Sequence, residues 1–204
     1  MKPVLVFATT NQGKLAELAA LVDDLFEIKG AADFSAFPEV NEDGETFVEN
    51  ALKKARAVAK HTGHNALADD SGLCVDALSG RPGVQSARYG RDDADRIARL
   101  LHELTGVPAL GRTAHFSCAL ALVTQDGMEI VTEGACPGNI ALAPRGEQGF
   151  GYDPVFVTES GKHMAELSKR EKSLISHRGH AFRKMLPHLK EVCEQQNATC
   201  HSER

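Results

Sequence analysis

Two adjacent aspartates, Asp69 and Asp70, lie within the stretch ALADDSGL at residues 66–73. Like charges side by side repel, and neither aspartate nor glycine favours the interior of a strand. Mg²⁺ prefers oxygen ligands and takes one or two carboxylates together with waters and substrate phosphates. The pair, with Ser71 beside it, therefore indicates either a solvated loop or a magnesium site. A nearby acidic stretch could supply a second carboxylate: Glu39, Glu42, Asp43, Glu45 and Glu49.

A second candidate site is the polar turn TTNQGK, residues 9–14, which follows a predicted strand and precedes a predicted helix. The free backbone N–H groups and the dipole at a helix start favour an anion, and Lys14 adds a full positive charge. The stretch lacks the G-x-x-x-x-G-K-[ST] pattern of a P-loop. It is typical of a phosphate-binding turn, and an ordinary solvated helix start is the alternative.

The stretch GFGYDP, residues 149–154, places two aromatic side chains, Phe150 and Tyr152, among glycines. Glycine lets the backbone come close to a ligand, and an aromatic ring can stack on a nucleobase. Asp153 could then accept a hydrogen bond from a ring N–H or a sugar hydroxyl. The alternative is that both rings belong to the hydrophobic core.

The stretch KREKSLISHRGH, residues 169–180, gathers lysine and arginine side chains near a predicted helix start. Such a cluster suits a polyphosphate or the oxygens of a base, although a solvated basic face has the same composition. His177 and His180 are three residues apart, but zinc would need two further ligands that the sequence does not supply. Zinc is therefore rejected.

The elements that must position these residues follow from apolar periodicity and turn signals. Residues Pro3–Ala8 predict a buried strand, and a helix should follow it on the apolar positions of residues 15–25. Thr46 and Glu49 have the spacing of a capping box, so a helix should begin there with Asn50 and Lys54 on one face. The remaining predictions are a very short strand at 66–73, a long loop at 78–90, a helix beginning at Asp92 and Asp93, strands at 113–123 and 128–134 joined at Asp126-Gly127, a strand at 154–157, and a C-terminal helix from about Ser173 that Pro187 should kink or split.

Length and composition set the broad class. The 204 residues, 42% of them hydrophobic, suffice for one domain or for one domain of two lobes. A formal net charge of -5 argues against a binder of nucleic-acid polymers. The five cysteines form no Cys-x-x-Cys pair and are expected to be reduced core residues. No signal-peptide pattern or membrane span is visible, so a cytoplasmic protein with a polar tail at 191–204 is expected.

Taken together, six stretches closely resemble the nonstandard-purine nucleoside triphosphate pyrophosphatases, the inosine/xanthosine triphosphatase or RdgB-like family. They occur in the family's order and cover most of residues 4–186. The stretches are ATTNQGK, ETFVENALKKA, ALADDSGLCVDAL, GRPGVQSARYG, GEQGFGYDPVF and ELSKREKSLISHRGHA.

The resemblance implies an α/β fold with an elongated central mixed sheet flanked by helices, and two lobes at residues 1–190 around a nucleotide cleft. It implies a homodimer that uses Mg²⁺ to hydrolyse ITP, dITP and XTP to the monophosphate and pyrophosphate. Asp70 would be the metal ligand and proton acceptor. Matched to the family's motifs, the substrate-binding residues would be Thr9, Thr10, Asn11, Gln12, Gly13, Lys14, Ser71, Phe150, Gly151, Tyr152, Asp153, Lys172, His177 and Arg178.

One departure from the family's pattern concerns the second metal-linked carboxylate. Many members carry an acidic pair before the following turn, where this chain reads Asn41-Glu42. Glu42 is the expected ligand; Glu39, another acid or the loss of this carboxylate is left open. The alternatives in function are a nucleotide kinase, a Maf-type pyrophosphatase with another base specificity, and a nucleotide sensor without turnover.

Overall fold

The computed structural model describes residues 2–9, 15 and 22–202, with side chains described as far as residue 198. The helix predicted over residues 15–25 falls mostly outside this range. Within it, the chain divides into two compact units. The first unit comprises Met1–Asp70, Ala119–Thr132 and Phe182–Arg204, and the second comprises Ser71–Cys118 and Glu133–Ala181.

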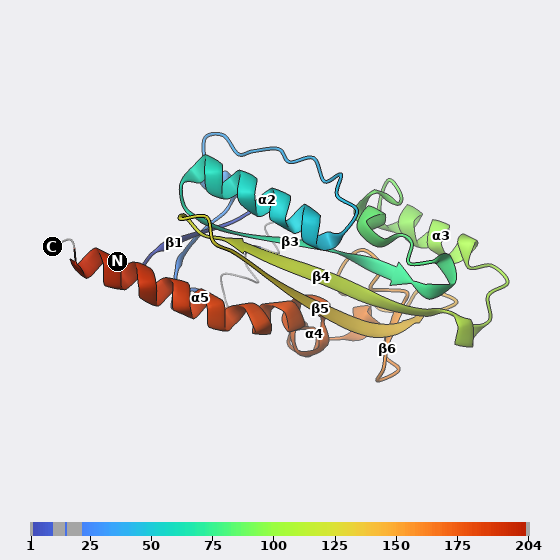
Figure 1. Cartoon of the computed structure of the whole chain (residues 1–204). Helices are drawn as coiled ribbons and strands as arrows, with labels where there is room; N and C mark the ends of the chain where they lie inside the picture. The colour runs from blue at the N-terminus through green and yellow to red at the C-terminus, as the bar shows by residue number, and fades with distance from the viewer. Residues whose placement is uncertain (1, 10–14, 16–21, 203–204) are drawn as a thin grey trace. The chain divides into compact units, whose positions relative to one another are not determined.

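Six strands form one mixed sheet in the order β2-β1-β3-β4-β5-β6 (Figure 1). Strand β1 pairs in parallel with β2 and with β3, whereas β6 pairs antiparallel with β5. The predicted α/β class and mixed sheet are confirmed. The strands are β1 (Val4–Phe7), β2 (Glu27–Lys29), β3 (Asn65–Val75), β4 (Thr113–Val123), β5 (Glu129–Ile140) and β6 (Phe156–Thr158).

The described helices begin where the sequence places polar caps. Asp92 caps α3 by accepting the Asp95 N–H, and Ser168 caps α4 by accepting the Glu171 N–H. The α-helices are α2 (Phe47–Thr62), α3 (Asp93–Glu103), α4 (Lys169–Ile175) and α5 (His177–Ser202). The short 3-10 helices are η1 (Ala31–Asp33), η2 (Asp76–Leu78), η3 (Gly83–Arg88), η4 (Ala109–Gly111) and η5 (Met164–Glu166).

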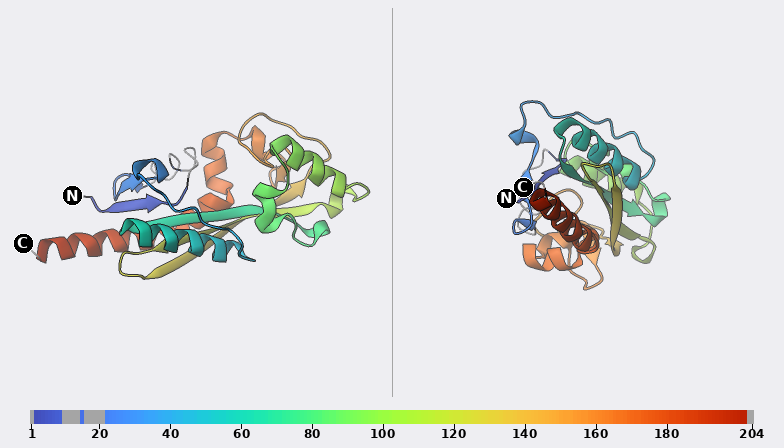
Figure 2. Two further views of the ribbon diagram at one scale, coloured as in Figure 1. Left: turned by 90° about the horizontal axis from the view of Figure 1, so that it is seen from above. Right: turned by 60° about the vertical axis from the view of Figure 1, so that its left-hand side comes forward.

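Helix α2 shows most clearly how the sequence determines an element of the first unit. Thr46 Oγ1 accepts the Glu49 N–H at 3.1 Å, and Glu49 Oε2 accepts the Thr46 N–H at 3.3 Å, so the predicted capping box is confirmed. Such a cap contributes about 1 kcal/mol. The helix runs along β3 in the left view of Figure 2, and its buried face is made mainly of small side chains. The facing residues are Ala51 and Ala55 on the helix and Ala66 and Ala68 on the strand.

The second unit has a separate core built from larger side chains. Phe116 and Phe156 pack with their ring centroids 4.5 Å apart. Leu73 of β3 and Leu100 of α3 are fully buried in the same cluster. The two cores supply the buried apolar surface that each unit needs for a fixed structure.

Three sequence predictions need correction. The stretch at 66–73 is no short strand with a loop, because β3 runs through the aspartate pair from Asn65 to Val75. The expected loop at 78–90 contains η3. Pro187 does not split the last helix: α5 continues through it, and the break falls at Ser176 between α4 and α5. Packing of the apolar face around Met185 and Leu189, both fully buried, outweighs the local cost of the proline.

Three of the four cysteines with described side chains are core residues, and Cys74 is half-buried. Cys118, Cys136 and Cys193 are buried, and no disulfide joins the described cysteines. Burial raises the pKa of the Cys136 thiol to about 11, so this thiol is an inert core group at neutral pH.

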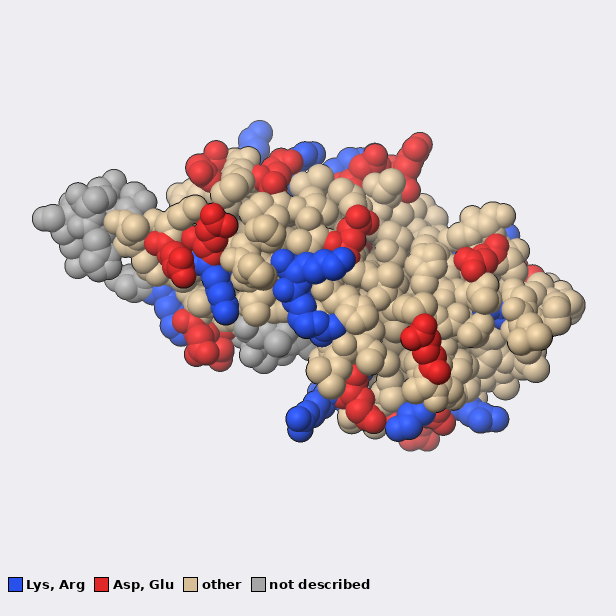
Figure 3. Space-filling model, turned by 60° about the horizontal axis from the view of Figure 1, so that its bottom comes forward, with Lys and Arg blue, Asp and Glu red and all other residues tan. Residues whose placement is uncertain are grey.

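Side chains of both charges share the surface. On the face in Figure 3, Lys and Arg side chains lie among Asp and Glu side chains. None of the helices in the described part of the chain combines the length and the apolar character needed to cross a bilayer.

Candidate functional site

The aspartate pair lies in the first unit, at the end of its part of β3. Asp69 and Asp70 are only 3% and 8% exposed, so neither is a solvated loop carboxylate. Successive side chains of a strand point to opposite faces, which separates the two charges. Accordingly, the charge of Asp69 is the smallest of the influences that raise the pKa of Asp70. The strand geometry therefore removes much of the repulsion that the sequence suggested.

Two side chains of α2 contact the carboxylate of Asp70. Asn50 Nδ2 donates to Asp70 Oδ2 at 3.1 Å, and Lys54 Nζ lies 3.5 Å from Asp70 Oδ1. Asn50 and Lys54 are four residues apart and so share one face of the helix. Sequence reasoning placed them on that face but did not assign them to the site. The missing information was that this face of α2 meets the acidic end of the strand.

Asn50 is fully buried, and its amide orientation is fixed by its other contact. The Gly44 N–H donates to Asn50 Oδ1 at 2.8 Å. Because a backbone N–H can only donate, the amide oxygen must face Gly44 and the amino group is left for Asp70. A Cβ at position 44 would lie 2.7 Å from Asn50 Oδ1, so the close approach requires glycine. Asn50 therefore joins the turn before α2 to the acidic end of β3.

The predicted second carboxylate, Glu42, lies near the same lysine. Lys54 Nζ is 3.2 Å from Glu42 Oε1 and 3.5 Å from Asp70 Oδ1, so one ammonium group is within ion-pair distance of both acids. The lysine side chain is 14% exposed. Two carboxylates that can share one ammonium group can also share a metal cation.

The acids fit magnesium better than a transition metal. Among the described residues, no group of three or more His, Cys, Asp and Glu side chains is arranged to hold a metal ion. Mg²⁺ needs only one or two carboxylates when waters and substrate phosphates complete its shell. Asp70 and Glu42 offer oxygen donors alone, which agrees with that preference.

Burial dominates the protonation of Asp70. Loss of hydration raises the pKa of its carboxyl above the usual range, while the Lys54 ammonium and the Asn50 hydrogen bond lower it. The net direction is upward. The folded protein thus holds a carboxylate whose charge these neighbours do not fully compensate, and a nearby cation would stabilise it.

The second unit carries the aromatic candidate. Phe150 is 49% exposed, so its ring is not part of the core. Lys172 Nζ lies 5.2 Å and Arg178 Cζ lies 5.4 Å from the centroid of the ring. The two cations lie over this accessible ring, so the ring combines apolar surface with hydrogen-bond donors close to it.

The loop that carries Phe150 is held by its own acid. Asp153 Oδ2 accepts the Phe150 N–H at 3.0 Å and also pairs with Lys172. At Gly149, where φ is +85°, a Cβ would lie 2.1 Å from Asp153 Oδ2. Asp153 was predicted to face base or sugar. In the structure its carboxylate closes the loop and holds the lysine beside the ring.

Ser71 joins this group. Arg178 Nη2 donates to Ser71 Oγ at 3.1 Å, so the structure brings together five predicted substrate residues of the second unit. They are Ser71, Phe150, Asp153, Lys172 and Arg178.

Tyr152 and His177 are predicted site residues that the structure packs inside the second unit. The Tyr152 hydroxyl donates to the carbonyl of Ser86 at 3.0 Å, and burial raises its pKa. The His177 ring stacks on Phe116 with centroids 4.9 Å apart. Both side chains bind or pack against other residues of the second unit. A direct contact of either side chain with substrate stays a prediction.

The predicted phosphate turn is mostly outside the described residues. Thr9 is described, and its backbone N–H donates to the carbonyl of Phe7 at 2.8 Å. The other predicted residues of the turn lie outside the described range: Thr10, Asn11, Gln12, Gly13 and Lys14. Their binding roles stay predictions.

Two proteins with known names are similar to this chain over most of its length. The dITP/XTP pyrophosphatase of Nitratidesulfovibrio vulgaris is 54% identical over 196 residues, which cover 91% of this chain and 95% of that protein. The enzyme of the same name from Geobacter sulfurreducens is 52% identical over 190 residues, covering 91% and 96%.

The structures of two Ham1 proteins are also similar to this chain. The Ham1 protein of Staphylococcus aureus superposes with a TM-score of 0.86 at 38% identity, over 93% of this chain and 99% of that one. A HAM1 protein from Coxiella burnetii gives 0.87 at 43%, over 94% and 100%. The model of the Ham1 family matches residues 5–188. This chain therefore belongs to the Ham1 family.

Proposed function

We propose that this protein is a Mg²⁺-dependent pyrophosphatase that cleaves ITP, dITP and XTP between the α- and β-phosphates. Membership of the Ham1 family, with relatives named dITP/XTP pyrophosphatase that are about half identical, makes the chain a hydrolase of nucleoside triphosphates with a nonstandard purine. The metal, the position of the bond that breaks and the roles of single residues are the proposed parts.

The observation that supports these parts most strongly is the environment of Asp70. Its carboxylate is 8% exposed, its pKa is raised by burial, and two groups of α2 hold it from one side. A carboxylate with a raised pKa is a better proton acceptor than an ordinary aspartate, which is the property that a general base needs. Perturbed carboxyl groups of this kind are typical of active sites.

In the proposed reaction, a water molecule attacks the α-phosphorus. A bond forms between the water oxygen and phosphorus, the bond to the bridging oxygen of the β-phosphate breaks, and pyrophosphate leaves. Asp70 accepts the proton that the water loses. Lys54, which lies beside this carboxylate, stabilises negative charge that develops on the phosphate oxygens.

Asp70 and Glu42 are the residues that would hold Mg²⁺. When bound, the ion supplies positive charge that offsets the charge on the phosphate oxygens. The turn Thr9–Lys14 would hold the phosphates that leave, because the helix start that the sequence predicts there and the charge of Lys14 suit a polyphosphate.

Selection of the base is assigned to the second unit. Arg178 and Lys172 flank Phe150 and carry donors but no acceptors. Hypoxanthine and xanthine have an acceptor oxygen at position 6, where adenine has an amino donor. An adenine stacked on Phe150 would place its amino donor against the donors of Arg178 and Lys172. A polar group left unmatched in a site without water is costly.

The test is an assay of products with ITP, dITP, XTP, dATP and dGTP in the presence of Mg²⁺. We expect the monophosphate and pyrophosphate from the first three, slower turnover of dATP, and no orthophosphate. Release of orthophosphate would contradict cleavage at the α-position. Equal rates for dITP and dATP would contradict the base assignment, and binding without turnover would support a sensor.

A metal series completes the assay. Turnover should stop when EDTA removes divalent cations and return when Mg²⁺ is added. Unchanged turnover in EDTA would contradict the metal dependence. The homodimer and the cytoplasmic location expected from the sequence stay predictions.

A further inference from the structure

The loop that carries Phe150 has a second anchor that comes from a distant part of the sequence. Asp93, the first residue of α3, accepts the Gly151 N–H on Oδ2 at 2.7 Å. Its other oxygen, Oδ1, pairs with Arg96 one turn farther along the helix. A carboxylate in the first turn of a helix normally stabilises its own helix through the dipole. This one also binds a loop 58 residues away.

The two anchors act on consecutive peptide groups. Asp153 holds the Phe150 N–H, and Asp93 holds the Gly151 N–H. Gly151 itself has a φ of +64°, a conformation that other residues rarely adopt. The backbone on both sides of the Phe150 Cα is therefore fixed by charge-assisted hydrogen bonds, which are stronger than neutral ones.

A third contact joins the loop to the strand segment after Ser71. The Tyr152 hydroxyl donates to the Ser86 carbonyl, and Ser86 Oγ accepts the Leu73 N–H at 2.9 Å. The loop is thus tied to α3, to its own aspartate and, through Ser86, to β3. All of these contacts lie within the second unit.

We propose that Asp93 is a positioning residue that fixes the direction of the Phe150 ring and thereby the affinity for the base. The inference rests on the proposed function, because it takes Phe150 as the stacking surface for the purine. Without the Asp93 bond, the Gly151 peptide can rotate, and the ring loses its fixed distance from Lys172 and Arg178. Binding of the base must then order the loop, which costs entropy and lowers the affinity. The groups around Asp70 are unchanged.

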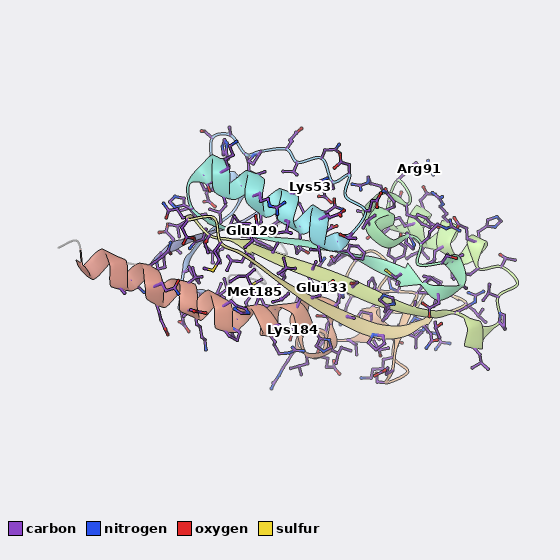
Figure 4. The ribbon with its side chains drawn as sticks, viewed as in Figure 1. Lys53, Arg91, Glu129, Glu133, Lys184 and Met185 are labelled. Carbon is purple, nitrogen blue, oxygen red and sulfur yellow. The ribbon has the colours of Figure 1, made fainter. Side chains whose placement is uncertain are left out.

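The chain contains a matched control on the same helix. Asp95 also lies in the first turn of α3, accepts a loop N–H, that of Arg91, at 3.0 Å, and pairs with an arginine side chain, again Arg91. The Arg91 side chain is 88% exposed and lies before α3 (Figure 4). Removing Asp95 therefore removes the same kinds of contact from α3 but leaves the Phe150 loop intact.

The experiment compares Asp93→Ala, Asp93→Asn and Asp95→Ala in steady-state hydrolysis of dITP, with thermal unfolding as a check of folding. We expect Asp93→Ala to raise KM about tenfold with kcat within about threefold, which is the scale of one hydrogen bond to a charged group. Asp93→Asn keeps an oxygen for the Gly151 N–H and should restore most of the affinity. Asp95→Ala should have the KM of the unmodified protein.

Two ligands separate positioning from general damage. Inorganic tripolyphosphate has no base, so its inhibition constant should be the same in all variants. Inosine monophosphate has the base and undergoes no cleavage, so its dissociation constant, measured by calorimetry, should rise only in Asp93→Ala. Equal weakening of tripolyphosphate, equal effects of the two alanine variants, or an unchanged KM in Asp93→Ala would overturn the inference.

These readouts also keep the two proposals apart. Failure of the unmodified protein to hydrolyse dITP, with inosine monophosphate still bound and weakened only in Asp93→Ala, would sink the proposed reaction and support the positioning role. Normal hydrolysis with an unaffected Asp93→Ala variant would sink the positioning role alone. Absence of both dITP hydrolysis and inosine monophosphate binding would contradict both.

Discussion

The candidate functional groups of the two units are built in different ways. In the first unit, Asp70 lies on β3 and its carboxylate contacts Asn50 and Lys54 of α2, so regular elements carry all three groups. In the second unit, Phe150 lies on a loop whose shape is set by hydrogen bonds from its backbone to Asp153 and Asp93.

The groups in the two units also differ in their exposure to solvent. Asp70 and Asn50 are 8% and 0% exposed, whereas the Phe150 ring is 49% exposed. A buried group on rigid elements suits bond breaking, because proton transfer requires a fixed geometry. An exposed ring on a loop suits binding, since stacking tolerates small displacements. The comparison therefore predicts that changes in the first unit lower kcat and that changes in the second unit raise KM.

The largest effect is expected for Asp70→Asn. The amide cannot accept the proton of the attacking water, so kcat should fall by about 10²–10⁴-fold, the usual contribution of a general base. The side chain keeps its size, and the fold should survive. Steady-state kinetics with dITP measure the effect, and full turnover in this variant would remove Asp70 from the mechanism.

Asn50→Asp should have the next largest effect. The new carboxylate still accepts the Gly44 N–H but presents an oxygen, in place of a donor, to Asp70. Loss of a group that orients a metal-binding carboxylate typically costs 10–100-fold, so kcat should fall by about that factor while KM for dITP changes little.

The matched control for Asn50→Asp is Arg56→Met, on the exposed side of the same helix. Arg56 forms a surface ion pair with Glu129, which is expected to contribute less than about 1 kcal/mol. The kinetic constants of Arg56→Met should equal those of the unmodified protein. A raised KM with an unchanged kcat in Asn50→Asp would contradict the comparison between the two units.

Phe150→Ala should act through binding. Stacking of one base on an aromatic side chain contributes about 1–3 kcal/mol, so KM for dITP should rise at least about fivefold. The change in kcat should be small because no group near Asp70 is altered. Phe150→Tyr, which keeps the ring, should behave like the unmodified protein, and a tenfold loss in kcat for the alanine variant would contradict the assignment of roles.

The smallest effect concerns stability and its dependence on pH. Burial raises the pKa of Asp70 in the folded state, so the ionised form lowers stability at neutral pH. In EDTA, Asp70→Asn should therefore unfold at an equal or higher temperature than the unmodified protein at pH 7.5. The difference should shrink as the pH falls through the raised pKa, because the folded protein then takes up a proton before the unfolded chain does. A variant that is less stable at pH 7.5 would contradict this sign.

Local signals in the sequence predicted much of the fold. The capping box at Thr46 and Glu49, the cap at Asp92 and the turn at Asp126-Gly127 each depend on neighbouring residues, so they could be read directly. The course of β3 through Asp69 and Asp70 could not. It depends on pairing of β3 with β1 and β4, its neighbours in the sheet, which come from other parts of the sequence.

The sequence predicted part of the candidate site, as it predicted part of the fold. Family motifs indicated Asp70, Phe150, Lys172 and Arg178, and the structure gives each a specific set of contacts. Asn50 had a signal, its helical spacing from Lys54. Asp93 had none, because a bond to a backbone N–H 58 residues away leaves no pattern in the types of either residue.

The central claim is that water attacks the phosphorus next to the sugar. Hydrolysis of dITP in water enriched with ¹⁸O, followed by mass spectrometry of both products, tests it most directly. The heavy oxygen should appear in the deoxyinosine monophosphate and leave the pyrophosphate unlabelled. Label in the pyrophosphate would mean attack at the β-phosphorus, and the roles given to Asp70 and its partners would then be wrong.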